Sequence, residues 1–241
     1  MDAIFFDLEG TIITLNQQYF IVNKALESEG IHLNIPKIYK LRGFGKYNVS
    51  KEFFKALVAF SKFKLNEKYL SNKNLESKLD YFVSKLTDDD IKLAKKLRKK
   101  YKKLRYGIPK IKDKLFPETK KALQILSKKY VLCIYTAIKR QSTVNLLHEL
   151  RIDKLFDVII GGEIKRKIGS KFIEKICRDM KASRENSYVV GDSEVDIIDG
   201  RKAGLKTILV LTGNGSVSLQ KKAKPDFVVK KLIEIPKILK M

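Results

Sequence analysis

Short apolar runs alternate with amphipathic segments over the second half of the chain. Apolar residues three or four positions apart predict helices at 117–128, 139–150, 170–181 and 194–203. The runs between and beside them are rich in Val and Ile, end in polar residues or glycine, and predict buried strands at 130–136, 156–162, 187–192, 206–213 and 226–229. Strands that are apolar on both faces and alternate with helices predict a doubly wound parallel sheet, with right-handed crossovers.

The first half of the chain begins with one more such run and then becomes helical. "AIFFD" (3–7) has the character of a buried parallel strand that ends in a loop. From 17 to about 105, apolar residues recur at helical spacing. Ser50 and Thr87 stand where they would cap two of these helices. The span therefore predicts an all-helical block.

Two prolines and a glycine interrupt the helical pattern at 106–118, and strands alternate with helices after that point. A domain boundary at this point divides the chain into two parts, and the fold class is α/β. We expect a Rossmann-like core formed by residues 1–15 and 110–241, and an inserted all-helical domain formed by residues 16–109.

The charge is large and unevenly distributed. Of the formal net charge of +24, residues 15–112 contribute +15, because they hold 24 Lys and Arg against 9 Asp and Glu. Such a surplus attracts phosphorylated metabolites and nucleic acid alike, so charge alone selects no partner. In "KLAKKLRKKYKKLR" (92–105) the pattern is typical of a solvated helix with one apolar stripe, and an anion-binding face is the alternative.

Several classes of protein are disfavoured. No apolar stretch reaches about 18 residues, and the amino terminus enters a strand-like run at once, so we expect a cytoplasmic protein without a membrane partner. Cys133 and Cys177 form no CxxC pair and are expected to be buried free thiols. His32 and His148 lack the neighbours of a metal site or a catalytic triad. The sequence does not indicate an oligomeric state.

Polar side chains follow three of the predicted strands where each strand ends. Asp7 and Glu9 follow the first run, Thr136 follows another, and Asp192 precedes Asp196 after a third. Carboxyl ends of parallel strands meet at one edge of a sheet, where three aspartates would repel one another unless a cation were bound. Oxygen ligands alone suit Mg²⁺, which also suits phosphate chemistry. The amides of the helix after Thr136 would suit a phosphoryl oxygen.

These stretches, in this order, resemble signatures of the haloacid dehalogenase-like hydrolases, most of which are magnesium-dependent phosphatases. "FFDLEGT" (5–11) resembles the first signature, "VLCIYT" (131–136) the second and "VVGDSEVDI" (189–197) the fourth. "GDSEVDIIDGRKAGLKTILVLTG" (191–213) is similar to the family's run from a metal-binding loop through a helix to the next strand. The resemblance covers nearly the whole chain and implies that the helical block is a cap that closes over the site and selects the substrate.

The resemblance implies a role for each matching residue. Asp7 would be the nucleophile that forms an aspartyl phosphate, and Glu9 would protonate the leaving oxygen and then deprotonate water. Thr136 would hold a phosphoryl oxygen. Asp7, the backbone carbonyl of Glu9 and Asp192 would bind Mg²⁺. Asp196 belongs to the same metal site and would orient the water molecules on the metal or the active-site lysine.

The third signature of the family is a lysine, commonly in Lys-Pro-x-Pro, that offsets the charge on the nucleophile and the transferred group. Lys167 lies 25 positions before Asp192 and is favoured, although "KIGSK" (167–171) lacks the prolines. Lys165 and Lys171 are the alternatives, the latter because it begins the following helix.

The resemblance also implies contacts with the substrate. Thr11 and Ala137 stand in or directly after the first two signatures. Arg42 and Lys46, in "LRGFGKYN" (41–48), occupy the region from which cap residues reach an anionic substrate. Since basic residues are common throughout this chain, a surface position without a role is the alternative for these two.

Position 9 departs from the common pattern, because most members carry Asp there. The extra methylene of Glu9 moves the acid by roughly an ångström. The enolase-phosphatase branch uses Asp-x-Glu-Gly-Thr, so Glu9 is compatible with activity, and dehalogenases lack an acid at this position. We therefore expect a magnesium-dependent phosphatase that acts on a small phosphorylated metabolite, such as phosphoglycolate or a sugar phosphate.

Two other functions remain open. The first is a catalytically weakened family member whose basic cap binds nucleic acid or another polyanion, which is possible but not favoured. The second is transfer of the phosphoryl group to an acceptor other than water, including mutase action, because the same residues permit it.

Overall fold

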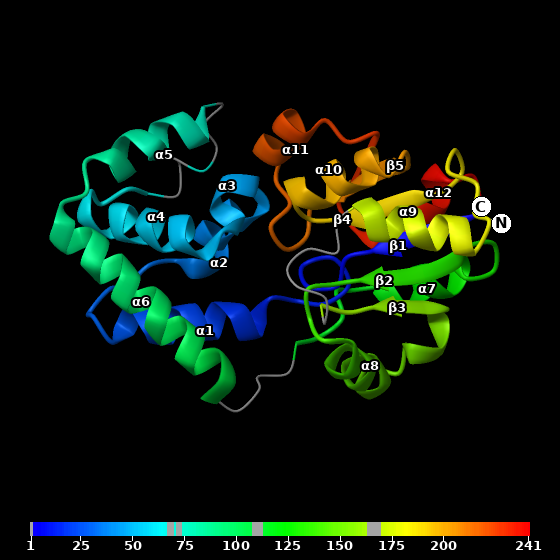
Figure 1. Cartoon of the computed structure of the whole chain (residues 1–241), viewed down its shortest axis with the longest axis horizontal. Coiled ribbons are helices and arrows are strands. Elements are labelled where there is room, and N and C mark those ends of the chain that lie inside the picture. Colours follow the sequence, from blue (N-terminus) through cyan, green and yellow to red (C-terminus); the bar gives the residue numbers. More distant parts are fainter. Residues whose placement is uncertain (1, 67–69, 71–73, 108–112, 163–169) are drawn as a thin grey trace. The chain divides into compact units, whose positions relative to one another are not determined.

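A computed structural model describes residues 2–66, 70, 74–107, 113–162 and 170–241. The chain divides into two compact units (Figure 1). We call the first the α/β unit, and it comprises Met1–Thr14, Lys114–Gly215 and Lys222–Met241. We call the second the helical unit, and it comprises Leu15–Asp113 and Ser216–Lys221.

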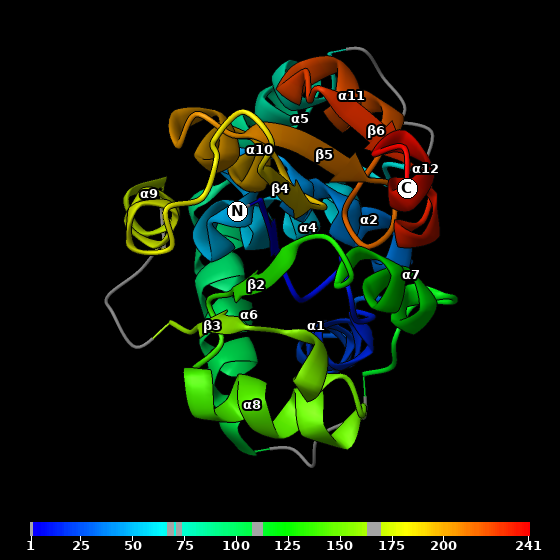
Figure 2. The same cartoon turned by 90° about the vertical axis from the view of Figure 1, so that its right-hand side faces the viewer.

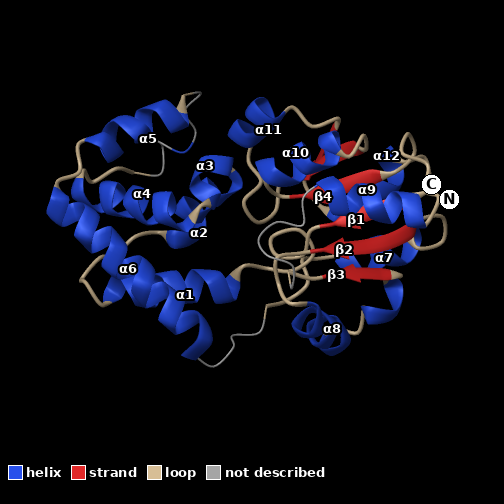
Figure 3. Cartoon of the chain, in the orientation of Figure 1, coloured by secondary structure: helices blue, strands red, loops and turns tan. Residues whose placement is uncertain are grey.

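A six-stranded parallel sheet forms the centre of the α/β unit (Figure 3). Its strand order is β3-β2-β1-β4-β5-β6, which is the order of the doubly wound folds. The predicted fold class and all six predicted strands are confirmed. The strands are β1 (Ala3–Phe6), β2 (Val131–Tyr135), β3 (Val158–Ile160), β4 (Tyr188–Gly191), β5 (Lys206–Val210) and β6 (Phe227–Val229).

Helices cover both faces of this sheet (Figure 2). The four predicted helices are present, each shorter than the pattern suggested by one to four residues: α7 (Thr119–Leu126), α8 (Arg140–Glu149), α9 (Ser170–Asp179) and α10 (Glu194–Lys202). A further short helix, α12 (Ile235–Ile238), follows β6, and α11 (Val217–Ala223) contributes residues to both units.

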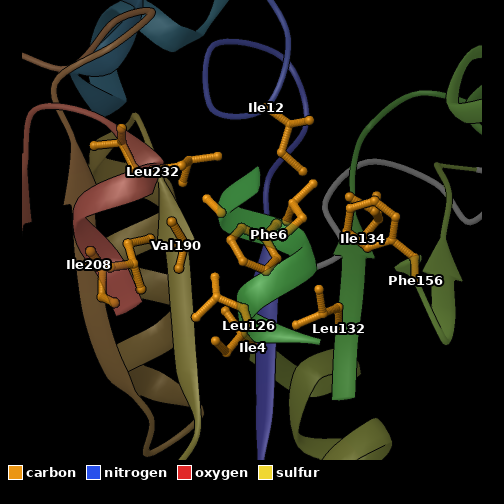
Figure 4. Packing of buried hydrophobic residues seen from close by; sticks show 14 of the residues in the cluster. Ile4, Phe6, Ile12, Leu126, Leu132, Ile134, Phe156, Val190, Ile208 and Leu232 are labelled. Carbon is orange, nitrogen blue, oxygen red and sulfur yellow. The ribbon is translucent and has the colours of Figure 1, made fainter. Parts of the chain in front are cut away.

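Alternation along the strands builds two apolar layers. In β1, Ile4 and Phe6 point to one face, where they pack with Leu132, Ile134 and residues of α7 and α12 (Figure 4). Ala3 and Phe5 point to the other face and pack with Cys133 and residues of α9. Burial of each large apolar side chain contributes about 1.5–3 kcal/mol, so the two layers fix the register of the strands and the points at which they end.

The helical unit contains α1 to α6. Its helices are α1 (Asn16–Glu27), α2 (Ile35–Ile38), α3 (Gly45–Asn48), α4 (Ser50–Lys62), α5 (Leu75–Ser84) and α6 (Asp88–Gly107). α6 buries Ala94, Leu97 and Tyr101 and packs against α1 and α4. The aromatic rings of Phe53 and Phe54 extend this core, with the Phe54 ring centroid 5.4 Å from that of Tyr101.

One of the two predicted helix caps is confirmed and the other is wrong. The Thr87 hydroxyl accepts a hydrogen bond from the Asp90 amide, and the Thr87 amide donates to the Asp90 carboxylate, so Thr87 caps α6. Ser50 is the first residue of α4 and makes no cap, because Val49 takes the cap position. The Ser50 hydroxyl instead accepts a hydrogen bond from Arg98 Nε at 3.0 Å.

Among the described residues, no helix combines the length and apolar character needed to cross a membrane.

Candidate active site

The order of the strands reverses between β1 and β4, at the centre of the sheet. The chain runs from β1 outward to β2 and β3, then returns to pair β4 on the other side of β1 and continues outward to β5 and β6. In open parallel sheets such a reversal leaves a crevice outside the carboxyl ends of the strands, and ligands bind there. Asp7 directly follows β1, Asp192 directly follows β4, and the Asp7 amide donates to the Val190 carbonyl at 2.9 Å.

Three carboxylates converge at this edge. Asp7, Asp192 and Asp196 each offer one oxygen atom, and these atoms all lie within 4.8 Å of one another. Asp196 reaches the cluster because Ser193 caps α10 and places Asp196 in its first turn. The structure thus brings together the three aspartates that the sequence predicted to share a cation. Three carboxylate oxygens at this separation fit a hard divalent cation such as Mg²⁺.

The electrostatics of the cluster agree with this fit. Burial raises the pKa of Asp7 well above its ordinary value, and the charges of Asp196, Asp192 and Glu9 raise it further. Burial and the charge of Asp196 raise the pKa of Asp192, and burial raises the pKa of Asp196. Each carboxylate therefore ionises with difficulty in the protein alone. A bound cation would reverse the sign of this interaction and keep the acids ionised.

The three acids differ in how many hydrogen bonds hold them. Asp196 Oδ1 accepts from the Tyr135 hydroxyl at 2.7 Å, and Asp196 Oδ2 accepts from the Ser193 amide at 2.9 Å and the Ser193 hydroxyl at 2.6 Å. Asp192 Oδ2 accepts from the Asn214 amide at 2.7 Å. Asp196 is thus the most firmly fixed of the three, which supports an orienting role for it.

Sequence reasoning missed Tyr135, Ser193 and Asn214. Ser193 carried a readable signal, because Ser-x-x-Asp at a strand-to-helix turn is a variant of the capping box. Tyr135 gave none, since the strand pattern predicts only that it is buried, and its partner lies 61 residues away. Asn214 lies in "TGNGS" (212–216), which gives no signal of a site because it lacks the spacing of nucleotide-binding loops.

Gly10 permits the close approach of the loop after β1 to Asp192. Its φ is +90°, a conformation that residues with a side chain rarely adopt. A Cβ atom at this position would lie 2.0 Å from Asp192 Oδ2, which is inside any allowed contact. The glycine that follows Glu9 in the first signature is therefore required by the packing of the acidic cluster.

The other residues predicted from the first two signatures occupy different environments. Glu9 is half-buried and its carboxylate lies outside the three-acid cluster, although its charge raises the pKa of Asp7. Thr136 is buried at the end of β2, where its hydroxyl accepts from the Ile138 amide at 3.3 Å, and Ala137 is exposed beside it. Thr11 is fully buried and its hydroxyl has no hydrogen-bond partner among the described residues, and its predicted contact with a substrate stays a prediction.

The structure describes one of the three candidate lysines of the third signature. Lys165 and Lys167 lie outside the described residues, so the preference for Lys167 stays a prediction. Lys171 lies in the first turn of α9 with an exposed side chain.

Arg42 and Lys46 lie in the helical unit, and each has partners inside that unit. The Arg42 guanidinium lies 5.9 Å from the Tyr39 ring centroid and 5.4 Å from that of Phe53. Lys46 forms an ion pair with Asp80 at 2.5 Å. Their predicted contact with a substrate stays a prediction, and the packing of Arg42 is a structural role that the sequence did not reveal.

Comparisons with known proteins agree with the signatures and the fold. A phosphoglycolate phosphatase of Aquifex aeolicus is 26% identical over 99% of this chain and 97% of its own length. A pyrophosphatase, PpaX, of Halalkalibacterium halodurans is 27% identical over 44% of this chain and 50% of its own length. The structure of a haloacid dehalogenase-like family protein of Streptococcus pneumoniae superposes with a TM-score of 0.61 over 99% of this chain and 98% of its own, at 19% identity, and shares the fold.

The family assignment follows from a match that spans most of the chain. Residues 4–210 match the model of the haloacid dehalogenase-like hydrolases, and this range begins in β1 and ends with β5. It includes Asp7, Thr136, Asp192 and Asp196, the residues on which the resemblance was based. The chain belongs to the haloacid dehalogenase-like hydrolase family.

Proposed function

We propose that this chain is a magnesium-dependent phosphatase that hydrolyses a small organic phosphomonoester through an aspartyl phosphate at Asp7. The observation that carries the proposal is the convergence of Asp7, Asp192 and Asp196 to within 4.8 Å at the switch point of the sheet. The names of the relatives, a phosphoglycolate phosphatase and a pyrophosphatase, support phosphoryl chemistry and suggest phosphoglycolate and inorganic pyrophosphate as the first substrates to test.

Asp7, Asp192 and the backbone carbonyl of Glu9 would hold the cation, with Asp196 beside them. When bound, Mg²⁺ would offset the negative charge of the acids and of the phosphoryl oxygens. The rest of the chemistry falls to side chains of this chain. Thr136, at the end of β2, is proposed to hold a phosphoryl oxygen, and the third-signature lysine, with Lys167 favoured, to offset charge on Asp7.

Asp7 and Glu9 would carry the two half-reactions. In the first, an oxygen of Asp7 attacks phosphorus, the bond between phosphorus and the leaving oxygen breaks, and Glu9 donates its proton to that oxygen. In the second, Glu9 takes a proton from water, the water oxygen attacks phosphorus, and the bond to Asp7 breaks to release inorganic phosphate. The half-buried position of Glu9, outside the three-acid cluster, suits a group that must exchange protons with both substrate and water.

Residues 16–109 are proposed to act as the cap that selects the substrate, by analogy with the family. Glu9 favours phosphate ester hydrolysis over dehalogenation, because a leaving alkoxide needs a proton and a leaving halide does not.

Hydrolysis of an aryl phosphate, with and without Mg²⁺, tests the proposal. The native chain should release the phenol only with Mg²⁺, and Asp7→Asn should abolish turnover because an amide cannot act as the nucleophile. Asp179→Asn is the matched control, since it removes an exposed carboxylate on α9 that pairs with Lys175. Turnover without Mg²⁺, or full activity of Asp7→Asn, would refute the mechanism. A panel of phosphoglycolate, sugar phosphates and pyrophosphate then ranks the substrates.

A second candidate function is binding of a polyanion by the helical unit. Along α6, Lys95, Lys99 and Lys102 are exposed at positions that share one face, and within the described residues none of them forms an ion pair. A nucleic acid held by these lysines would dissociate steeply as salt rises from about 50 to about 200 mM. Replacing the three with Glu should abolish this binding. Replacing the exposed Lys120, Lys121 and Lys128 of the α/β unit should leave it unchanged.

A further inference from the structure

The turn that follows β5 connects two of the segments that supply acids to the site. It comprises residues 212–215 and is closed by a hydrogen bond from the Gly215 amide to the Thr212 carbonyl at 2.7 Å. The Thr212 hydroxyl donates to the Gly10 carbonyl at 2.7 Å, in the loop after β1. The Asn214 amide donates to Asp192 Oδ2, also at 2.7 Å, in the loop after β4. One turn therefore contacts both loops.

The turn lies against Asp192 so closely that a side chain at its second position would not fit. Gly213 has φ +46°, and a Cβ atom there would lie 2.3 Å from Asp192 Oδ2 and 2.4 Å from the Gly10 Cα atom. Turns with positive φ at the first central position favour glycine, so conformation and packing select the same residue. The Thr-Gly-Asn order is thus explained by its contacts with the acidic cluster.

The side chain of Asn214 supplies an independent observation. It is 8% exposed, and it also hydrogen-bonds Asp192. Its Oδ1 atom is buried and has no hydrogen-bond partner among the described residues. A buried acceptor of this kind calls for a donor, and next to a carboxylate cluster the donor that fits is a water molecule bound to a cation.

We propose that the turn at 212–215 is a positioning element for the metal site, with Asn214 and Thr212 as its two positioning residues. Asn214 orients Asp192 so that Oδ1 faces the cation while Oδ2 is held by the turn. Thr212 fixes the Gly10 carbonyl and, through it, the loop that carries Asp7 and the carbonyl of Glu9. The turn after β5 then sets the spacing between the loop after β1 and the loop after β4. This inference rests on the proposed function, because it assumes a cation at the acidic cluster.

Direct measurement of cation binding tests the proposal without relying on turnover. Mn²⁺ binding to the native chain is followed by electron paramagnetic resonance, with Mg²⁺ as competitor. Asn214→Ala and Thr212→Val should each weaken Mn²⁺ binding by about 10-fold or more, the usual effect of removing a partner that orients a ligand. Thr212→Ser keeps the hydroxyl and should restore native affinity. Asp192→Asn should abolish binding and so locate the cation at the cluster.

Matched controls separate positioning from general loss of stability. Thr207→Val removes a buried threonine hydroxyl of β5 that donates to Asp226 at 2.7 Å, the same distance as the bond of Thr212, but away from the acids. It should lower the Tm and leave the Mn²⁺ affinity unchanged. Asn145→Ala removes an exposed amide on α8 and should change neither.

The possible results distinguish this proposal from the proposed function. Native affinity in both Asn214→Ala and Thr212→Val, with binding lost in Asp192→Asn, would overturn the positioning role and leave the metal-dependent phosphatase intact. Absence of Mn²⁺ binding in the native chain would overturn both. Equal weakening in Thr207→Val and Thr212→Val would also overturn the proposal, because it would assign the effect to stability.

Discussion

The helical unit and the α/β unit treat buried polar groups in opposite ways. In the helical unit, the Tyr47 hydroxyl donates to Asp80 and the Tyr101 hydroxyl to Gln18, so polar groups within the core are paired. In the α/β unit, three carboxylates lie close together, and burial and the charge of Asp196 raise the pKa of both Asp7 and Asp192. Among the described residues, the buried side-chain oxygens without a partner also belong to the α/β unit: Thr11, Thr119 and Asn214.

This difference separates structural polar groups from functional ones. A paired buried group contributes modestly to stability and is costly to break. A cluster of like charges destabilises the protein that carries it, and such clusters are found where a ligand compensates them. The contrast supports the proposed site in the α/β unit, and substitutions in either unit can test it.

Substitution of Glu9 should have the largest effect, which is a loss of turnover. Glu9→Gln removes the group proposed to exchange protons with the substrate and water, and should lower kcat by about 100- to 10,000-fold. Mn²⁺ affinity should stay close to native, because the Glu9 carboxylate is not part of the three-acid cluster. Activity is measured with the aryl phosphate. A loss of cation binding equal to the loss of kcat would place the carboxylate among the metal ligands instead.

The next effect is a gain in stability at the candidate site. Without a divalent cation, Asp7→Asn should raise the free energy of unfolding by about 1–3 kcal/mol at neutral pH, because it removes a partly buried charge that is repelled by two others. Chemical denaturation measures it, and Asp179→Asn is the control on an exposed acid. A lower stability of Asp7→Asn would mean that the charge of Asp7 is compensated within the protein.

The raised pKa of Asp7 also fixes how the stability of the protein depends on pH. The pKa of Asp7 is raised in the folded state, so between its unfolded and folded values the folded protein binds more protons. Stability of the native chain without cation therefore falls as pH rises through that window, which begins near the ordinary value of 3.8. Asp7→Asn should show a weaker fall, and saturating Mg²⁺ should remove the difference.

In the helical unit, removal of a buried polar group should lower the stability instead of raising it. Tyr101→Phe deletes the hydroxyl that donates to Gln18 Oε1 at 2.8 Å and should lower the free energy of unfolding by about 1–2 kcal/mol. Tyr81→Phe is the matched control, because Tyr81 is 60% exposed. A stability of Tyr101→Phe equal to that of the native chain would weaken the contrast between the two units.

Substitution of Arg42 should have a smaller effect on stability. It also tests the predicted contact of Arg42 with an anionic substrate. Arg42→Met keeps the aliphatic stem and removes the charge that lies over the Tyr39 and Phe53 rings, so stability should fall by about 0.5–1 kcal/mol. If Arg42 also binds an anionic substrate, KM rises while kcat changes little. An unchanged KM would limit Arg42 to packing within the helical unit.

The sequence predicted the α/β unit well because its signals are local. Strands β1 and β4 are short apolar runs that end in Asp7 and Gly191-Asp192, and the rules of parallel sheets place their ends together. Ser50 shows where local rules fail, since its hydroxyl pairs with Arg98, a residue 48 positions away. Capping rules consider only residues near the start of the same helix, so they do not predict this partner.

The supporting residues of the site were missed for the same reason. Tyr135 contacts Asp196 across 61 positions, and Thr212 contacts Gly10 across 202. Their side chains are ordinary members of a strand and a turn until the fold brings the partners together. Residues that carry out chemistry leave a pattern of types and spacing, whereas residues that orient them are defined by tertiary contacts.

The smallest effect concerns groups whose shifted pKa has no link to chemistry. Burial raises the pKa of the Cys133 thiol to about 12, and burial also raises that of Cys177. Both thiols are free and buried as predicted, and they pack in the apolar layer against α9, away from the strand ends. Since only the thiolate reacts, iodoacetamide at pH 8 should leave both cysteines unmodified in the native chain and modify both in the unfolded chain, as measured by mass spectrometry. Rapid modification of native Cys133 would show that the layer opens. Protection of both thiols in the native chain would agree with burial as the main cause of their raised pKa values, in contrast to Asp7, whose pKa is also raised by the charges of neighbouring acids.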